Sequence, residues 1–102
     1  MPSSRRLEFT REAEADIREI LQYTRDAWGE AQRRKYAATL DASFNLLALF
    51  PFIGTRRDEL SPGLRRHPVG EHVVYYRVSD DAVVIRRVFH GRRDVRSTDD
   101  ID

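Results

Sequence analysis

Two strand-like runs near the C-terminus set the tightest limit on the fold of this chain. His72–Val78 and Val83–His90 are rich in β-branched and aromatic residues, and Ser79-Asp80-Asp81 between them has the composition of a turn. Antiparallel strands can be joined by so short a connection, whereas parallel strands need a long crossover. The sequence therefore predicts a β-hairpin at the end of the domain.

The second of these runs has an unusual polar content. It contains Arg86 and Arg87, ends at His90 and continues into Gly91-Arg92-Arg93-Asp94. A buried strand has no structural need for adjacent arginines, so this segment is predicted to recognise an anionic group. Seventeen of the eighteen basic residues are arginine, whose planar fork suits carboxylate and phosphate partners. A GC-rich genome would also favour arginine codons, so composition alone does not decide the matter.

The first half of the chain reads as a short strand followed by two helices. Arg6–Phe9 alternates polar and apolar residues, and Thr10 is placed to cap a helix that carries an apolar stripe at three- and four-residue spacing. Gly29 is predicted to end this helix. A second amphipathic helix should then run from about Glu30 and stop near Phe50, because Pro51 disfavours helical geometry in the residue before it.

The segment between the helices and the hairpin is less regular. Pro51–Gly63 contains two prolines and two glycines without a sustained period, which predicts a loop of about a dozen residues. Leu64–Val69 reads as a short strand, and Gly70 supplies a turn before the next one.

The order of elements, β-α-α-β-β-β, predicts an α+β fold in which a helical hairpin covers one face of a small, mainly antiparallel sheet. The other face is expected to be open and to carry side chains such as Arg65, Arg77, Arg86 and His90, depending on strand register. Residues 1–102 should form a single domain, with frayed tails at residues 1–5 and 95–102.

Composition excludes several classes of protein. The chain of 102 residues has no cysteine, hence no disulfide framework and no thiolate metal site, and no apolar run approaches twenty residues. No apolar region follows the N-terminal residues, so they do not read as a secretory signal, and a cytoplasmic protein is expected. His67, His72 and His90 lack metal-ligand spacing, and neither a metal nor a cofactor is expected.

Three aromatic residues have expected structural positions. Trp28 lies on the apolar stripe and is predicted to be a core residue that sets the hairpin angle. Tyr75 and Tyr76 should point to opposite faces of the sheet, one into the core and the other exposed.

Several motifs together resemble the ParE branch of the RelE/ParE toxin superfamily, over about Leu7 to Asp94. In chain order they are Tyr23 with Trp28-Gly29, Leu49–Gly54, Arg57–Leu60, Pro62–Arg66, His72–Val78 and Arg86–Asp94. The resemblance implies a cytoplasmic toxin of a type II toxin–antitoxin system. It implies neutralisation by a ParD-like antitoxin and, for the free toxin, inhibition of DNA gyrase through protein contacts without enzymatic activity. Any contact with DNA would be indirect, through the antitoxin or gyrase.

Two alternatives to gyrase inhibition remain open. The RelE branch of the superfamily consists of ribosome-dependent mRNA endonucleases, which are lysine-rich around the cleavage centre, and this chain has only Lys35. Other nucleases of the superfamily use a glutamate, an arginine and a C-terminal histidine. Glu59, Arg65 and His90 are the candidates for these roles here. The remaining alternative is an inactive relative that only binds its antitoxin.

The expected contact residues fall into two groups. Gyrase would be bound by the arginine pairs of the C-terminal strand and its extension, Arg86, Arg87, Arg92 and Arg93. A disordered antitoxin tail would place apolar side chains in a groove between the helical hairpin and the sheet edge, with arginines at the rim pairing to its acids. The antitoxin contacts expected to be exposed on the two helices are Leu21, Tyr23, Tyr36 and Leu40.

Overall fold

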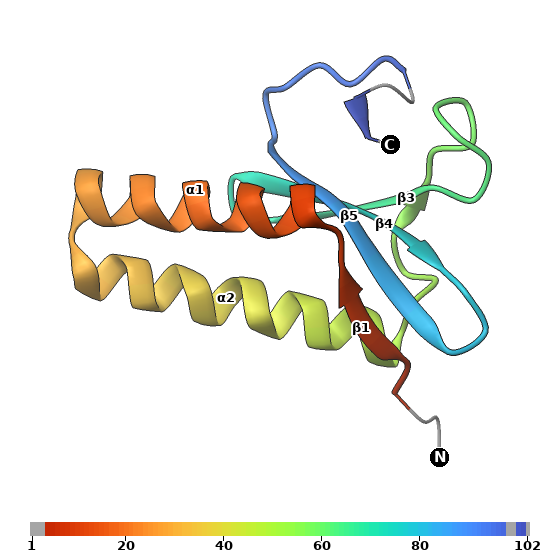
Figure 1. The fold of residues 1–102 in the computed structure, drawn as a ribbon, viewed down its shortest axis with the longest axis horizontal. Coiled ribbons are helices and arrows are strands. Elements are labelled where there is room, and N and C mark those ends of the chain that lie inside the picture. The colour runs from red at the N-terminus through yellow and green to blue at the C-terminus, as the bar shows by residue number, and fades with distance from the viewer. Residues whose placement is uncertain (1–3, 98–99, 102) are drawn as a thin grey trace.

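In a computed structural model, which describes residues 4–97 and 100–101, a helical hairpin lies against one face of a five-stranded sheet (Figure 1). The elements are β1 (Arg6–Phe9), α1 (Arg11–Trp28), α2 (Glu30–Leu49), β2 (Thr55–Arg56), β3 (Arg65–Val69), β4 (His72–Val78) and β5 (Ala82–His90). The predicted α+β class is confirmed. The addition to the predicted order is the two-residue strand β2, which lies inside the segment predicted as a loop.

The strands are arranged in the order β1-β5-β4-β3-β2. All neighbouring pairs are antiparallel except β1 and β5, which are parallel. The N-terminal strand therefore pairs with the C-terminal strand, as Figure 1 shows by the adjacent red and blue arrows. This pairing places the start of α1 beside β5.

Local signals set the helix ends. The Thr10 hydroxyl accepts a hydrogen bond from the Ala13 N–H (3.0 Å) and donates one to the Arg86 carbonyl (2.7 Å), so the N-cap of α1 also joins the helix to β5. Gly29 separates the helices with a φ of 97°, a conformation that glycine adopts readily. The second helix ends at Leu49, one residue before the predicted limit.

A β-bulge interrupts the pairing of β4 with β5. Tyr76 pairs with Ile85 but Tyr75 pairs with Arg87, so Arg86 is the extra residue in β5. Side chains alternate along a strand, so this insertion reverses the face on which every later residue of β5 lies. His90 consequently lies opposite His72.

The main core lies between the helical hairpin and the sheet. Its buried residues, here called the hairpin-side core, are Ala13, Leu40, Phe44, Leu47, Val69, Val74, Tyr76, Val83, Ile85 and Val88. The buried Tyr76 hydroxyl donates to the Pro51 carbonyl (2.7 Å) and accepts from the Gly54 N–H (2.9 Å). These two bonds attach the loop after α2 to the centre of the sheet.

The opposite face of the sheet is partly covered, so the expectation that it is open is wrong. A second set of buried residues, here called the loop-side cluster, consists of Leu60, Leu64, Val73, Tyr75, Phe89, Val95 and Ile101. The loop before β3 and the C-terminal segment supply the cover. As predicted, Tyr75 and Tyr76 contribute to opposite faces, but both are buried, and the prediction that one is exposed is wrong.

The prediction of frayed tails is also wrong for the residues that the structure places. Val95 and Ile101 are buried, and the Arg5 N–H donates to the Ala48 carbonyl at the end of α2 (2.9 Å). Residues 1–3, 98, 99 and 102 lie outside the described part of the chain. Among the described residues, no helix is long and apolar enough to cross a membrane.

Candidate functional site

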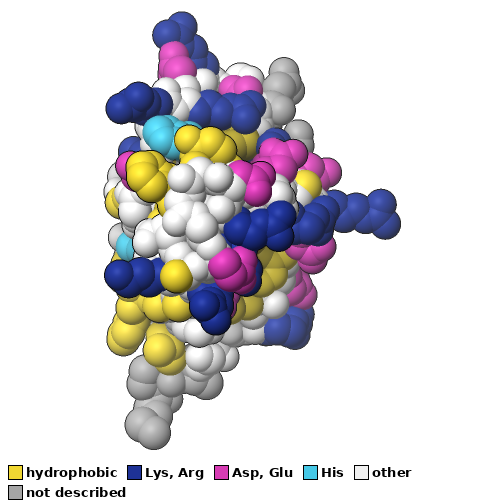
Figure 2. All heavy atoms as spheres, turned by 90° about the vertical axis from the view of Figure 1, so that its left-hand side faces the viewer, with side chains coloured by type: hydrophobic (Ala, Val, Ile, Leu, Met, Phe, Trp, Pro, Cys, Tyr) yellow, Lys and Arg dark blue, Asp and Glu magenta, His cyan; other side chains and the backbone are white. Residues whose placement is uncertain are grey.

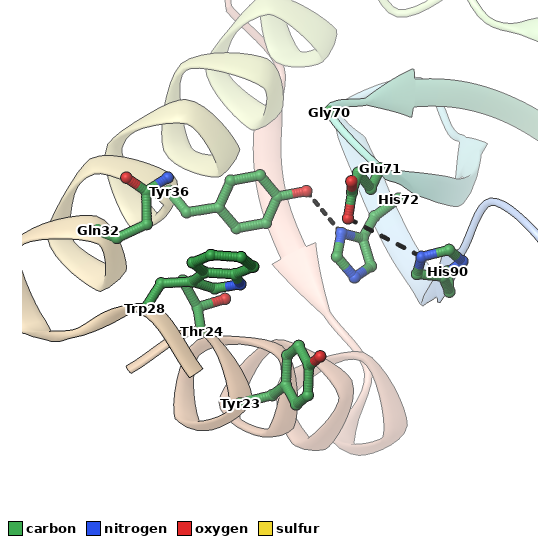
Figure 3. Close-up of a pocket in the computed structure, with 9 residues that line it drawn as sticks. All are labelled: Tyr23, Thr24, Trp28, Gln32, Tyr36, Gly70, Glu71, His72 and His90. Carbon is green, nitrogen blue, oxygen red and sulfur yellow. Dashed lines mark hydrogen bonds and ion pairs between the residues drawn. The ribbon is translucent and has the colours of Figure 1, made fainter. Parts of the chain in front are cut away.

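The closed end of the helical hairpin extends past the sheet (Figure 1), and a cleft lies between it and the β3–β4 turn (Figure 3). This hairpin cleft has a volume of about 600 Å³. Its lining residues are Tyr23, Thr24, Trp28, Gln32, Tyr36, Gly70, Glu71, His72 and His90. Both helices, the β3–β4 turn and the paired ends of β4 and β5 thus contribute.

Tyr36 and His72 form a partly buried polar contact in the cleft. The Tyr36 hydroxyl donates to the Val69 carbonyl (3.1 Å) and lies 2.5 Å from His72 Nδ1. Both hydrogen bonds form at once when His72 carries its proton on Nδ1 and donates it to the tyrosine oxygen. Burial lowers the pKa of His72 and raises the pKa of Tyr36, so both groups are neutral near pH 7.

His90 is held at the mouth of the cleft by its own chain. Its Nδ1 accepts a hydrogen bond from the Arg92 N–H (3.1 Å), and its Nε2 lies 4.0 Å from a Glu71 carboxylate oxygen. The His72 and His90 rings are 5.5 Å apart in an edge-to-face arrangement. The bulge at Arg86 makes this contact possible, because it puts His90 on the hairpin side of the sheet, where His72 lies.

Aromatic side chains form the outer wall of the cleft. Trp28 is 73% exposed, so the prediction that it is a core residue is wrong. The last turn of α1 lies beyond the sheet, and the apolar stripe has no strand beneath it there (Figure 1). Viewed from the closed end of the hairpin, hydrophobic side chains gather beside a histidine, with charged side chains around them (Figure 2).

The residues expected to contact an antitoxin lie in different surroundings. Tyr23 and Tyr36 both line the hairpin cleft, and Leu21 is half-buried against the hairpin-side core. Leu40 is only 1% exposed. The expectation that Leu40 is an exposed contact is therefore wrong, because its position on α2 faces the sheet.

The four arginines predicted to bind a target differ in their environments. The Arg87 guanidinium donates to both carboxylate oxygens of Asp16 on α1, at 2.8 and 3.0 Å, and these side chains are only 22% and 12% exposed. The hydrogen bond to Asp16 is the main reason that the pKa of Arg87 is raised. Arg86 is half-buried at the bulge. Only Arg92 and Arg93 are exposed, just beyond β5.

The Arg93 side chain contacts an aromatic ring and a carboxylate. Its guanidinium lies 3.9 Å from the centre of the Phe89 ring and 3.8 Å from Asp100. Arg87 lies over the same ring at 4.4 Å. Phe89 of the loop-side cluster therefore helps to position the Arg93 side chain.

The three candidate nuclease residues are not brought together. Arg65 and His90 lie on the hairpin side of the sheet. Across the sheet, His90 aligns with His72 on β4 and with Val69 on β3. Arg65 is four residues from Val69 along β3, a distance of about 13 Å. Its guanidinium donates to the Gly54 carbonyl (2.8 Å) and the Phe52 carbonyl (3.2 Å).

Glu59 lies in the loop that covers the opposite face, and it accepts a hydrogen bond from Arg57 (2.9 Å). Arg77, also expected on an open face, donates to the Pro62 carbonyl (2.6 Å) and is hydrogen-bonded to Ser61. No group of three or more potential metal ligands occurs within the described part of the chain.

The hairpin cleft contains several residues to which the sequence assigns no functional role, above all Glu71, His72 and Gln32. The pairing of His72 with His90 depends on the bulge, for which the sequence carries no clear signal. The exposure of Trp28 depends on how far the helices extend past the sheet.

Comparison with known proteins identifies the family. Residues 7–95 match the model of the ParE toxin of type II toxin–antitoxin systems. The chain belongs to the ParE toxin family. Among individual relatives, it is 37% identical over 84 residues to toxin ParE1 of Mycobacterium tuberculosis, covering 81% of this chain and 86% of the relative. It is 39% identical over 89 residues to toxin ParE of Escherichia coli, covering 85% of each.

Solved structures agree with the fold of this ParE-family chain. A chain of the chromosomal ParDE toxin–antitoxin system of P. aeruginosa superimposes with a TM-score of 0.73 at 21% identity, covering 85% of this chain and 96% of that one. A chain of the toxin–antitoxin complex RelBE2 from Mycobacterium tuberculosis gives a TM-score of 0.62 at 26% identity, covering 86% and 99%. At 21% identity, the likeness to the ParDE chain concerns the fold alone. The chain of the RelBE2 complex has the same architecture.

Proposed function

We propose that this ParE-family toxin inhibits DNA gyrase in the cytoplasm through protein contacts and is silenced by a ParD-like antitoxin. The family assignment over residues 7–95 supports the toxin role. The similar P. aeruginosa chain comes from a ParDE system, which supports a ParD-like partner. Gyrase as the target is the expectation carried by the resemblance to ParE, and it is the part that needs a direct test.

The separation of Glu59, Arg65 and His90 is the observation that favours protein contacts over RNA cleavage. Cleavage needs a proton acceptor, a cation at the phosphate and a proton donor within reach of one phosphodiester. Here Arg65 holds the loop after α2, and Glu59 lies on the other face of the sheet. Arg65 is also about 13 Å along β3 from Val69, the residue that aligns with His90 across the sheet. Lys35, the lone lysine, is exposed on α2.

Arg92 and Arg93 are the best candidates for the gyrase contact. Both are exposed, and the Arg92 backbone is tied to His90, so their position relative to β5 is defined. A charge-assisted hydrogen bond of arginine at an interface typically contributes about 1.5–3 kcal/mol. Arg87, in contrast, holds α1 against β5 through Asp16 and has a structural role.

The antitoxin is proposed to bind the hairpin cleft. A disordered segment can fold on binding and cover such a surface, and the burial of apolar area then gives a large negative heat-capacity change. Tyr23 and Tyr36 lie in this cleft, and Leu21 is half-buried against the core beside them. Calorimetry with the product of the neighbouring reading frame tests the partner, and absence of binding at micromolar concentration refutes it.

A supercoiling assay with purified gyrase and the purified toxin tests the target. We expect inhibition that is relieved by the antitoxin. Replacing Arg92 and Arg93 together by alanine should weaken inhibition roughly ten- to a hundredfold, since about 1.4 kcal/mol corresponds to tenfold. Arg18→Ala with Arg34→Ala, which removes two exposed arginines of the helices, is the matched control and should retain full inhibition.

The nuclease alternative gives opposite results in the same experiments. Under the present proposal His90→Ala removes one hydrogen bond to the Arg92 backbone and should weaken gyrase inhibition much less than loss of both arginines, whereas RNA cleavage would require His90 or Arg65. Expression in cells separates the two, with DNA breaks read from SOS induction and transcript cleavage mapped by primer extension. Cleaved transcripts without DNA damage would overturn gyrase as the target.

A further inference from the structure

The charge of the hairpin cleft differs from that of the rest of the chain. None of its nine lining residues is a lysine or arginine, although the chain has 18 such residues, and Glu71 is the one carboxylate among them. Phosphate and carboxylate groups are bound by cations or by clustered N–H donors. The cleft is therefore a poor receptor for an anion and a suitable one for a cation.

The aromatic side chains of the cleft favour a cation of a particular shape. Tyr23 and Trp28, 68% and 73% exposed, and the half-buried Tyr36 surround the space shown in Figure 3. The faces of tyrosine and tryptophan rings attract cations, and tryptophan does so most strongly. A guanidinium group is planar and can stack on such a ring, whereas an ammonium group cannot.

Two hydrogen-bond acceptors border the same space, His72 inside the cleft and Glu71 at its exposed edge. In the tautomer that satisfies both contacts of the Tyr36 hydroxyl, His72 donates from Nδ1 and its Nε2 carries a lone pair. Figure 3 shows this second nitrogen directed away from Tyr36. The Glu71 side chain is 85% exposed, and its carboxylate lies at the mouth of the cleft, 4.0 Å from His90 Nε2. Burial lowers the pKa of His72, so near neutral pH the ring does not repel a cation.

We propose that the hairpin cleft receives an arginine side chain of the antitoxin, stacked against Trp28 and hydrogen-bonded to His72 and Glu71. The identity of the partner rests on the function proposed above, but the chemistry of the group rests on the cleft alone. The exposed aromatic side chains and the neutral histidine would then share one role, which is to bind this arginine. The arginine anchors the partner at the end of the domain away from β1.

A fluorescence titration of the toxin alone tests the chemistry. Trp28 is the one tryptophan of the chain, so its emission reports directly on the cleft. N-acetyl-arginine methylamide should change this emission in a saturable way near neutral pH, with a dissociation constant on the order of 1 mM, as befits a single side chain on an open site. N-acetyl-citrulline methylamide has nearly the same shape without the charge and should bind at least several-fold more weakly.

Two matched variants locate the effect. Glu71→Gln removes the carboxylate of the cleft and should weaken the arginine probe roughly two- to fivefold, the modest change expected for an exposed charge. Glu59→Gln removes an exposed carboxylate in the loop before β3 and should change nothing. Both side chains are on the surface, so both variants should fold, which circular dichroism can verify.

Either of two results would overturn the proposal. Equal binding of the citrulline and arginine probes would show that the cleft accepts neutral planar groups. No saturable change up to roughly fifty times the expected dissociation constant would show that it takes neither. These failures concern the cleft of the free toxin, and they are distinct from a failure of antitoxin binding in calorimetry or of gyrase inhibition.

Discussion

The contact between Asp16 and Arg87 should contribute more to stability than any exposed ion pair of this protein. Asp16 accepts two hydrogen bonds from the Arg87 guanidinium and a third from the Val88 N–H (3.0 Å), so one carboxylate attaches α1 to β5 through three donors. Asp16→Asn keeps the size of the side chain but removes the charge and one acceptor. Hydrogen bonds to charged groups contribute about 1.5–3 kcal/mol each, and these three are coupled, so we expect a total loss of about 2–3 kcal/mol.

Thermal unfolding followed by circular dichroism measures this loss. For a domain of this size about 1 kcal/mol corresponds to 4–8 °C, so Asp16→Asn should lower Tm by roughly 10–20 °C. The matched control is Glu8→Gln, because Glu8 also accepts two hydrogen bonds from one arginine, Arg6, but on the exposed surface of β1. The control should melt with the parent protein. If Asp16→Asn melts within about 2 °C of the parent, the contact has no structural importance.

Three further predictions concern how far individual side chains are buried. Tyr76→Phe should cost about 1–3 kcal/mol in chemical denaturation, because it leaves the loop amide and carbonyl that the hydroxyl satisfies without a partner. Burial lowers the pKa values of His67 and His72, so as the pH drops through about 6.5 the unfolded chain takes up protons before the folded one, and the free energy of unfolding should fall. Replacing both histidines by glutamine should make the free energy of unfolding less dependent on pH in this range. Trp28→Ala should change stability by less than about 1 kcal/mol, whereas Leu40→Ala should cost about 2–5 kcal/mol, and the reverse order would contradict the observed burial.

The elements that the sequence predicts well are those with local signals. The helix caps at Thr10 and Gly29 and the breaker Pro51 act on their own neighbours, so the helix ends fall within a residue of their predicted positions. The β4–β5 hairpin is equally clear, because its turn and strand residues are adjacent in the sequence. In contrast, β2 has two residues, too few for any period to be visible.

The errors concern contacts between distant parts of the chain. Val95 and Ile101 are isolated apolar residues in a polar tail, and nothing local indicates that they bury Tyr75 and Phe89 on the far face of the sheet. Trp28 continues the apolar stripe of α1, but burial of a stripe requires a surface opposite it, and the helix is longer than the sheet that it covers.

The bulge at Arg86 explains why the candidate site could not be assembled from the sequence. Without it, strict pairing from Val78 and Val83 onward would place Phe89 opposite His72, and His90 would lie on the loop side of the sheet. The extra residue instead sends Arg87 and Phe89 to the loop side and His90 to the hairpin cleft. The Thr10 hydroxyl donates to the carbonyl of Arg86, and Asp16 binds Arg87 and the Val88 N–H directly after it. The N-terminal half of α1 thus stabilises the bulge that places Arg87 on the loop side of the sheet and His90 in the hairpin cleft. Loss of Asp16 should therefore disturb the cleft as well as the core.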